Sequence, residues 1–449
     1  MSERNRLLVL FAATAGAIMV PLNTSMLSVG LAPIMNDFHV SVSATTWLVL
    51  LYLVVITSMQ PMAGKLGDRY GHRTVFLLAL VLFGLASLGA ATAASFPVLV
   101  LFRVLQGLTS SALGPNAAAL IRLAYPLEHQ GKAMGLYVGT FSMGLTMGPV
   151  ISGLLVSSLG WRGIFWINVP AVAMALWLGA RVLPPSPGGV RTPFDWSGTT
   201  VFTALIGGTV VALNLWKGGT LPIPLWTVLP VAAVLAVLLY RLEERAPDPL
   251  IRFGLFRLPG FGASNLAIFL LHSMVYIMLV AVPLYLQEGR GLHPATSGVL
   301  MAVFSLMQVL VAPIAGRLSD RFGRRIPVVA GGLLYLATAL AFMGLSEVTP
   351  VWLLAASLVM AGIGTGLTGA PVQATALAAC PPDDVGVGSG VWYSARYLGN
   401  ICGALMSGLL LPARLGGGAP VLYGTMAVVA LALAASTGLL PRAAAIPTS

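Results

Sequence analysis

GKLGDRYGHR, at positions 64–73, returns little altered as GRLSDRFGRR at positions 316–325. Six of the ten positions are identical, and they include Asp68 with Asp320 and Arg69 with Arg321. Each copy follows one apolar run of membrane-spanning length and precedes another, in a chain of which 8% of the residues are charged. A charged segment that recurs in the same setting indicates an internal duplication. The sequence therefore predicts two membrane bundles of related design.

The composition is that of a membrane protein. Of the 449 residues 57% are hydrophobic, and the mean hydropathy is +0.92, whereas soluble chains are nearer half apolar and a quarter charged. Apolar runs recur that are long enough to cross a hydrocarbon core of about 30 Å. We expect an all-α polytopic protein without a separate soluble domain, and we interpret the apolar N-terminus as a retained first span rather than a cleaved leader.

Fourteen spans can be placed along the chain. They lie at about 7–33, 44–63, 74–94, 97–121, 132–156, 163–184, 197–216, 222–241, 261–286, 295–315, 326–345, 350–374, 385–411 and 420–440. The repeated decapeptide falls after span 2 and again after span 10, which is the offset of two six-span bundles with two extra spans between them. The predicted division is therefore a six-helix bundle in 1–186, two inserted helices with linkers in 187–258, and a second six-helix bundle in 259–449.

The basic residues predict the orientation. With the N-terminus inside, 18 of the 24 Lys and Arg residues fall in cytoplasmic segments, four fall on the opposite side, and Arg103 and Arg396 lie within spans. By the positive-inside rule both termini are cytoplasmic. Topology thus accounts for the net charge of +11, and we expect no nucleic-acid partner.

The repeated decapeptide predicts a tight turn between two helices. Gly64 and Gly71 allow close backbone approach and unusual dihedral angles. Asp68 and Asp320 could meet a helix N-terminus or an arginine as a switchable charge contact. The alternative is a solvated loop, which a spacing kept in both copies disfavours. The residues assigned a gating role here are Gly64, Asp68, Arg69, Gly71, Arg73, Gly316, Asp320 and Arg321.

Several segments resemble one superfamily of transporters. Residues 64–73 resemble the signature loop of the major facilitator superfamily, and residues 103–107 (RVLQG) resemble its second motif. Residues 144–153 (GLTMGPVISG) are similar to a span 5 motif associated with antiporters. Residues 161–170 (WRGIFWINVP) and 194–198 (FDWSG) resemble segments of the fourteen-span drug:proton antiporter family. The resemblance covers essentially the whole chain.

This resemblance implies two bundles around a central cavity, which export amphipathic compounds by alternating access in exchange for protons. In span 5, Gly144, Gly148 and Gly153 would allow tight packing on a neighbouring helix, and Pro149 would bend the span. Ordinary helix packing and a rocking contact that favours export both account for these four residues.

The chain departs from the family in its acidic residues. The family commonly has an acid in span 1, and the matching position here is Asn23. All 13 acids fall in predicted loops or at span ends: Glu3, Asp37, Asp68, Glu128, Asp195, Glu243, Glu244, Asp248, Glu288, Asp320, Glu347, Asp383 and Asp384. A buried carboxylate is the usual proton carrier and cation counter-ion in such pumps. The predicted cavity is therefore a poor site for a lipophilic cation.

The two arginines within spans point to a different cargo. A charge at mid-membrane costs about 2.5–3.5 kcal/mol, so it usually faces a cavity or a partner. The alternative for Arg103 is a structural bond to backbone carbonyls, and for Arg396 it is snorkelling toward an interface. Trp392, Arg396 and Asn400 share one helical stripe beside Tyr393. This stripe could bind an anionic or zwitterionic amphiphile, or it could simply pack.

His272 lies in the middle of span 9, with Tyr276 one turn further on. An imidazole titrates near neutral pH, so His272 could replace the missing carboxylate as a proton carrier. The alternative is a neutral histidine bonded to a hydroxyl or carbonyl group. Asn116 and Gln308 are further polar residues on helices that we expect to line the cavity.

The sequence thus predicts a secondary active transporter that exports neutral or anionic amphipathic molecules, with coupling to protons left open. The residues expected to line its binding cavity are Asn23, Arg103, Asn116, His272, Tyr276, Gln308, Trp392, Tyr393, Arg396 and Asn400. The alternative is an uncoupled or differently coupled carrier or flippase for a lipid or metabolite. A membrane enzyme is disfavoured because no catalytic cluster surrounds the histidines, and neither a metal nor a cofactor is expected. We expect a monomer in the plasma membrane, most simply a bacterial inner membrane.

Overall fold

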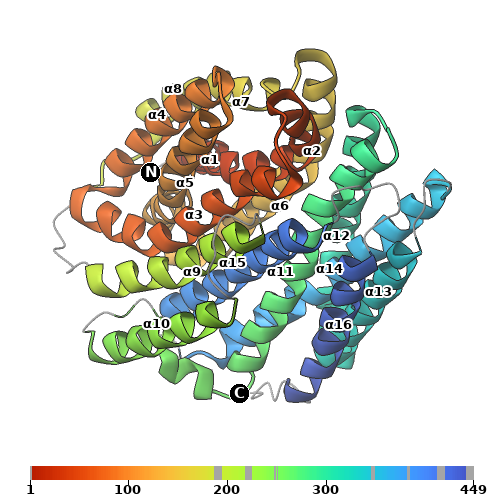
Figure 1. The fold of residues 1–449 in the computed structure, drawn as a ribbon. Helices are drawn as coiled ribbons and strands as arrows, with labels where there is room; N and C mark the ends of the chain where they lie inside the picture. Colours follow the sequence, from red (N-terminus) through yellow and green to blue (C-terminus); the bar gives the residue numbers. More distant parts are fainter. Residues whose placement is uncertain are drawn as a thin grey trace. The chain divides into compact units, whose positions relative to one another are not determined.

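The computed structural model describes residues 3–186, 195–217, 225–246, 249, 251–344, 349–381, 385–411 and 420–440, and these contain helices but no strand (Figure 1). The helices are α1 (Glu3–Ala17), α2 (Met19–Phe38), α3 (Val42–Tyr70), α4 (His72–Ala91), α5 (Phe96–Ala124), α6 (Leu127–Leu159), α7 (Gly163–Trp166), α8 (Asn168–Val182), α9 (Trp196–Lys217), α10 (Leu225–Arg245), η1 (Phe253–Arg257), α11 (Phe261–Leu284), η2 (Tyr285–Gly289), α12 (Pro294–Phe322), α13 (Arg325–Met343), α14 (Val351–Ala379), α15 (Val385–Leu410), α16 (Pro420–Ser436) and η4 (Thr437–Leu439).

The prediction of an all-α polytopic membrane protein is confirmed. Each predicted span coincides with a helix or a pair of helices, α1 with α2 forming the first span and α7 with α8 the sixth. Within the described residues, 12 helical stretches are long and apolar enough to cross a membrane, and a shorter apolar one runs from Met143 to Leu159. Helices such as α3 run past the predicted span ends, because a helix can continue into polar residues beyond the hydrocarbon core.

The chain forms two compact units. The first contains Met1–Val40 and Trp47–Gly207, and the second contains Ser41–Thr46 and Gly208–Ser449. The boundary lies within α9, in the region predicted to be an insertion between two bundles. The three-part division drawn from the sequence stays a prediction.

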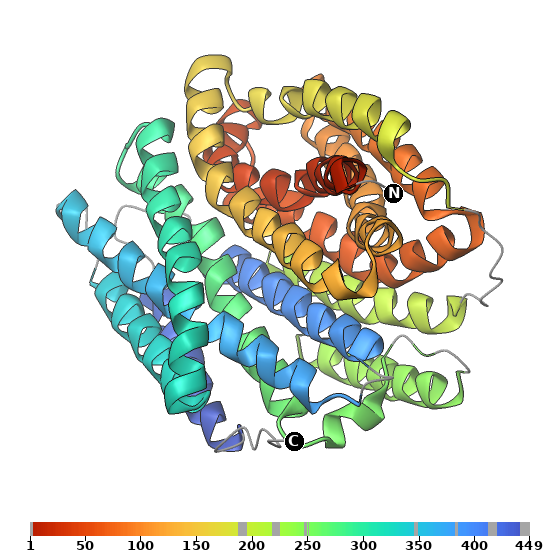
Figure 2. The same ribbon diagram turned by 180° about the vertical axis from the view of Figure 1, so that it is seen from behind.

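The two units repeat one packing pattern (Figures 1 and 2). In the first unit, α2 packs on α6, while α4 packs on both α5 and α8. In the second unit, α11 packs on α15, while α13 packs on both α14 and α16. In span order these are the first and fifth, third and fourth, and third and sixth helices of each predicted six-span bundle. The internal duplication therefore extends from the decapeptide to the packing of the helices.

In each unit a glycine lies very close to a neighbouring helix, and the two glycines occupy corresponding places: Gly148 on α6 and Gly403 on α15. A Cβ atom at Gly148 of α6 would lie 1.9 Å from Oγ of Ser25 on α2. A Cβ atom at Gly403 of α15 would lie 2.1 Å from the carbonyl oxygen of Ser273 on α11. Both distances are far below van der Waals contact, so a residue with a Cβ would force the helices apart. Small residues allow such close approach in membrane helices.

Candidate functional site

The repeated decapeptide is mostly helix, and each copy turns at a glycine with a positive φ angle. In the first copy, α3 continues to Tyr70, Gly71 has φ 91°, and α4 begins at His72. In the second copy, α12 continues to Phe322 and Gly323 has φ 82°. Glycine adopts such positive φ angles at little cost. The charged side chains therefore lie on helix ends rather than on an extended loop.

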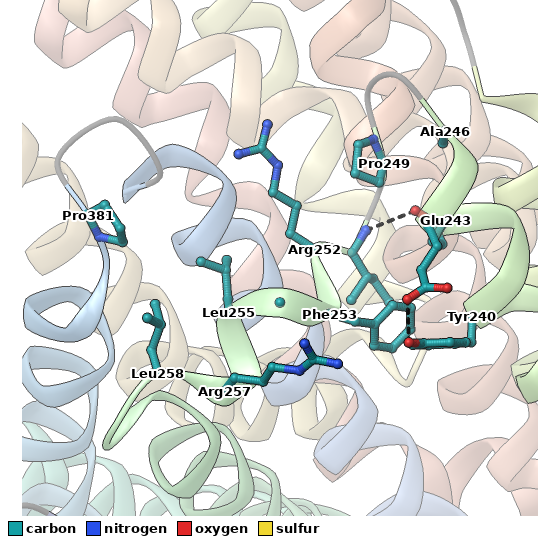
Figure 3. A pocket seen from close by; sticks show the side chains of 13 residues that line it. Tyr240, Glu243, Ala246, Pro249, Arg252, Phe253, Leu255, Arg257, Leu258 and Pro381 are labelled. Atoms are coloured by element: carbon teal, nitrogen blue, oxygen red, sulfur yellow. Dashed lines mark hydrogen bonds between the residues drawn. The ribbon is translucent and has the colours of Figure 1, made fainter.

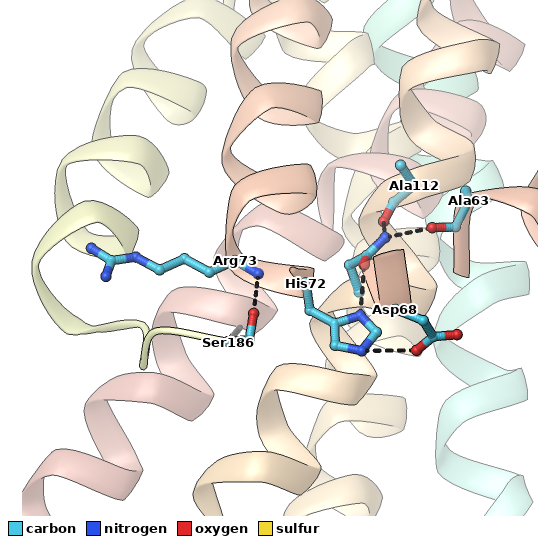
Figure 4. Close-up of polar contacts among 7 residues, drawn as sticks. Ala63, Asp68, His72, Arg73, Ala112 and Ser186 are labelled. Carbon is cyan, nitrogen blue, oxygen red and sulfur yellow. Dashed lines mark hydrogen bonds and ion pairs between the residues drawn. The ribbon is translucent and has the colours of Figure 1, made fainter. Parts of the chain in front are cut away.

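A polar cluster joins the first turn to α5 (Figure 4). Nε2 of His72 lies 3.3 Å from the Asp68 carboxylate, and its Nδ1 lies 2.8 Å from Oδ1 of Asn116. The Asn116 amide nitrogen donates to the carbonyl groups of Ala63 and Ala112, so its oxygen is the acceptor that faces the ring. Both ring nitrogens of His72 therefore face acceptors. Asn116, which was predicted to line the cavity, is bonded to the predicted gate.

Arg73 connects the same turn to the end of α8. Its backbone N–H donates to Oγ of Ser186 at 2.9 Å, and its guanidinium donates to the carbonyl oxygen of Ala180 at 2.6 Å. A Cβ atom at Gly71 would lie 2.2 Å from the carbonyl oxygen of Ser186. The last carbonyl groups of a helix lack partners within the helix, and Arg73 supplies one here.

Arg325, at the position of Arg73 in the second copy, makes the equivalent contact in the second unit. Its Nε donates to the carbonyl oxygen of Leu440 at 2.7 Å, and its Nη2 donates to that of Gly438 at 2.8 Å. Arg321 lies over the ring of Phe322 at 5.2 Å, and the side chain of Asp320 is outside the described residues. Sequence reasoning assigned no role to Arg325, although alignment of the two copies could have identified it.

Gly71→Ala is expected to destabilise the first unit by about 1–3 kcal/mol, because the new side chain would combine a positive φ angle with a backbone clash. Thermal unfolding of the purified variant in detergent measures this. Gly316→Ala is the matched control, since a Cβ atom there has no heavy atom within 4 Å and α12 is helical at that position. If the two variants unfold at the same temperature, the proposed constraint at Gly71 is wrong.

Arg103 of α5 is buried at the centre of a polar network in the first unit. Its Nε donates to the carbonyl oxygen of Leu48 at 3.1 Å, and its Nη1 donates to Oε1 of Gln106 at 2.9 Å and to Oδ1 of Asn23. The guanidinium carbon lies 4.4 Å from the centre of the Tyr52 ring, and the residue is 1% exposed. The acceptors in these bonds are all neutral. The structure thus joins two predicted cavity residues, Asn23 and Arg103, through a buried bond.

The network extends beyond Arg103 to a shared hydroxyl group. The amide nitrogens of Gln106 and Asn168 lie 2.8 Å and 3.3 Å from Oγ of Ser87. The amide nitrogen of Asn23 is buried and has no hydrogen-bond partner within the part of the chain that the structure describes. A buried donor without an acceptor is costly, so this N–H group is available to an acceptor that enters the network.

The second unit contains a separate polar cluster on α11 and α15. Nδ1 of His272 lies 2.9 Å from Oδ1 of Asn400, and both residues are buried. One turn before Asn400, Arg396 is partly exposed. The rings of Trp392 and Tyr393 meet edge to face with centres 5.1 Å apart.

Of the two remaining cavity candidates, Tyr276 lies on the same helix as His272 and Gln308 lies on another helix. Tyr276 is buried on α11, one turn after His272. Gln308 lies on α12, where its carbonyl oxygen would be 2.8 Å from a Cβ atom at Gly366 of α14. The described contacts do not connect Gln308 to the His272 cluster.

The span 5 residues take part in helix packing. A Cβ atom at Gly144 would lie 2.9 Å from Cγ1 of Ile18, the residue that separates α1 from α2. Pro149 and Gly153 are buried, and α6 is continuous through Pro149. The packing predicted for Gly144 is therefore present, whereas the rocking contact stays a prediction.

Gly399 and Gly403 are the counterparts of Gly144 and Gly148 in the second unit, 255 positions further on. A Cβ atom at Gly399 would lie 2.4 Å from the carbonyl oxygen of Phe269 on α11. Sequence reasoning missed this pair because only the first pair lies in a segment that resembles a family motif. The spacing of four residues on corresponding helices is the signal that could have found it.

Comparison with known proteins gives matches over nearly the whole chain. A model of the Major Facilitator Superfamily matches residues 13–240 and 265–446. The multidrug resistance protein Stp of Mycobacterium tuberculosis is 32% identical over 92% of this chain and 77% of its own length. The tetracenomycin C resistance and export protein of Streptomyces glaucescens is 31% identical over 98% of this chain and 83% of its own. The riboflavin transporter RibZ of Clostridioides difficile is 29% identical over 88% of this chain and 86% of its own length.

The fold is also found among solved structures. The crystal structure of a bacterial homologue of the human lysosomal transporter Spinster matches with a TM-score of 0.68 and 18% sequence identity. The match covers 98% of this chain and 95% of the other. At this level of identity the likeness shows the fold alone.

Proposed function

Because this chain belongs to the Major Facilitator Superfamily and is a membrane transporter rather than an enzyme, we propose that it exports amphipathic small molecules that are neutral or anionic. Two of the relatives described above, Stp and the tetracenomycin C protein, are named for drug resistance or export, which supports the direction. The charge of the substrate is proposed from the residues of this chain.

The observation that carries the proposed substrate class is the environment of Arg103. The buried guanidinium donates to Asn23, and the amide nitrogen of Asn23 has no hydrogen-bond partner within the described part of the chain. A buried donor that lacks an acceptor is costly. An anionic substrate group would accept from the Asn23 amide and would be attracted by the guanidinium when the transport cycle exposes this network. A cation would be repelled by the Arg103 guanidinium and could not accept a hydrogen bond from the Asn23 amide.

The placement of the acids supports the same substrate class. In the helices whose bounds the structure gives, acidic residues lie no more than three residues from a helix end. No carboxylate is therefore available at the middle of these helices to pair with a lipophilic cation. Arg396, partly exposed beside Trp392 and Tyr393, is the proposed counter-charge in the second unit.

For proton coupling, the proposed carrier is His272, because no acid lies near the middle of a described helix. Its hydrogen bond to Asn400 joins α11 to α15, so a change in its protonation would act on a contact between two helices. We further propose alternating access as the mechanism, a monomer as the working unit, and a location in the plasma membrane with both termini in the cytoplasm.

The proposed substrate class is tested with purified protein in liposomes, using an anionic and a cationic dye of similar size and hydrophobicity. We expect the anionic dye to be transported on the order of tenfold faster, as expected for one charge-assisted hydrogen bond. Each dye is measured with and without a pH gradient to test the coupling. Transport of the cationic dye alone would show that the proposed substrate class is wrong.

Asn23→Asp is expected to reduce transport of the anionic dye by about tenfold, because the new carboxylate would occupy Arg103 as an internal ion pair. Initial transport rates in the same liposomes measure this. Asn36→Asp is the matched control, since it makes the same change at an exposed position on the same helix. An equal loss in both variants would argue against competition at Arg103.

The second candidate is a carrier for a metabolite, which the likeness to RibZ favours. The two proposals differ in selectivity, because a metabolite carrier would transport one compound and reject chemically unrelated dyes. Competition between several unrelated anionic dyes and riboflavin in the same liposomes separates them.

A further inference from the structure

The second unit contains a pocket of about 590 Å³ at the end of α10 (Figure 3). It is bordered by the last turns of α10, by Ala246, Pro249 and Ile251, by η1 and by the residue that comes two positions after α14. Its charged and aromatic lining residues are Tyr240, Glu243, Glu244, Arg252, Phe253 and Arg257. None of them belongs to the clusters around Arg103 and His272, so the pocket is independent of the proposed transport site.

The pocket lies at the depth expected for lipid headgroups. One candidate span ends at Arg245 and the next begins at Phe261, and most of the lining residues fall between these two points or in the last turns of the first span. The connecting segment exposes both charged and aromatic side chains: Arg252 and Arg257 are exposed, and Phe256 is 42% exposed. Aromatic and basic side chains are typical of the membrane–water interface.

The charges that line the pocket cancel. Arg252 and Arg257 contribute two guanidinium groups, and Figure 3 shows the group of Arg257 directed toward Phe253 and Tyr240. Glu243 and Glu244 contribute two carboxylates at the opposite wall, on α10. A simple anion would therefore meet repulsion as well as attraction, whereas a ligand that carries both charges would be matched.

The two carboxylates are held in place by the structure. Glu243 is 2% exposed, and its Oε2 accepts the backbone N–H of Ile251 at 3.2 Å. Glu244 accepts a hydrogen bond from the hydroxyl group of Tyr240 and is itself exposed. The Tyr240 ring also packs on Phe253, with ring centres 5.1 Å apart. Acidic and aromatic groups thus form one ordered wall of the pocket.

We propose that this pocket binds a phospholipid whose headgroup joins a phosphodiester to a primary ammonium group, as in phosphatidylethanolamine. The guanidinium groups of Arg252 and Arg257 would bind the phosphate, for which their planar fork of donors is suited. The ammonium group would donate to Glu244, and the aromatic wall would contact the glycerol. Phosphatidylglycerol lacks the ammonium group, and the quaternary ammonium of phosphatidylcholine cannot donate a hydrogen bond.

The proposal is tested by native mass spectrometry of the purified full-length protein. Phosphatidylethanolamine, phosphatidylglycerol and phosphatidylcholine with the same acyl chains are titrated separately. We expect phosphatidylethanolamine to bind on the order of tenfold more tightly than either of the others, as a charge-assisted hydrogen bond would give. Tighter binding of phosphatidylglycerol would overturn the proposal. Full displacement of the lipid by equimolar soluble phosphoethanolamine would also overturn it, because the ligand would then not be a lipid.

Two sets of variants locate the binding to this pocket. The double variant Arg252→Gln with Arg257→Gln is expected to weaken binding of phosphatidylethanolamine by about tenfold or more. Arg241→Gln with Arg245→Gln makes the same change in charge at exposed positions of α10 outside the lining, and it should leave binding unchanged. Glu244→Gln should weaken binding of phosphatidylethanolamine but not of phosphatidylglycerol.

Thermal unfolding confirms that each variant is folded before lipid is added. Equal losses in the two double variants would show that binding is a general effect of basic charge near the membrane, and the proposed site would be wrong. Transport activity does not enter this test, so the result is independent of the proposed substrate.

Discussion

Gly403→Ala is expected to lower the stability of the second unit by about 2–3 kcal/mol, toward the upper end of overpacking costs. The new Cβ atom would lie 2.1 Å from the carbonyl oxygen of Ser273 and 2.9 Å from Cβ of Tyr276. The first of these is a backbone atom and cannot move alone, so α15 and α11 must separate. For a unit of this size the unfolding temperature should fall by about 4–12 °C.

Gly390→Ala is the matched control for this experiment. It lies on the same helix, where a Cβ atom has no heavy atom within 4 Å, and alanine favours a helix over glycine by about 1 kcal/mol. Its unfolding temperature should therefore stay the same or rise. If Gly403→Ala unfolds at the same temperature as Gly390→Ala, the close contact between α11 and α15 does not limit the stability of the unit.

Arg103→Gln is expected to reduce transport of an anionic substrate by about 100-fold, because it removes a buried, charge-assisted donor. It also leaves the carbonyl oxygen of Leu48 and the side chains of Asn23 and Gln106 without their donor, and each such group costs about 1–3 kcal/mol. Some loss of folded protein is therefore expected as well. Transport rates are divided by the amount of folded protein to separate the two effects.

A neutral substrate of similar size shows whether Arg103 interacts with the charge of the substrate or has a structural role alone. If the guanidinium balances substrate charge, the anionic substrate should lose at least tenfold more activity than the neutral one, and Arg103→Lys should restore part of the difference. Arg122→Gln, at an exposed position on the same helix, is the matched control. Equal losses for both substrates, after correction for folded protein, would mean that Arg103 has a structural role alone.

Much of the fold could be predicted because its signals are local. Hydropathy located the spans, and the decapeptide revealed the duplication that the packing of α2 on α6 and α11 on α15 repeats. The turn itself was predicted less well. Gly71 alone separates α3 from α4, since hydropathy marks the part of a helix within the hydrocarbon core and not the end of the helix.

The candidate site was harder to predict because its contacts join distant parts of the chain. Asn23 and Arg103 were both selected as cavity residues, but no spacing rule could show that they bond to each other. Asn116 was placed with them from its position on a helix, and the structure bonds it instead to His72 beside the predicted gate. The role of each of these residues in transport stays a proposal.

The sequence by itself determined the class of the protein, the place of its apolar helices, and the lack of acids in mid-helix, because each of these depends on composition along a single segment. The tertiary structure alone decided which polar groups accept hydrogen bonds from Arg103, which glycines lie against a neighbouring backbone, and that Arg73 bonds to the end of α8 and Arg325 to residues at the end of η4. Those contacts depend on the angle and register at which helices pack, and neither is encoded within one helix.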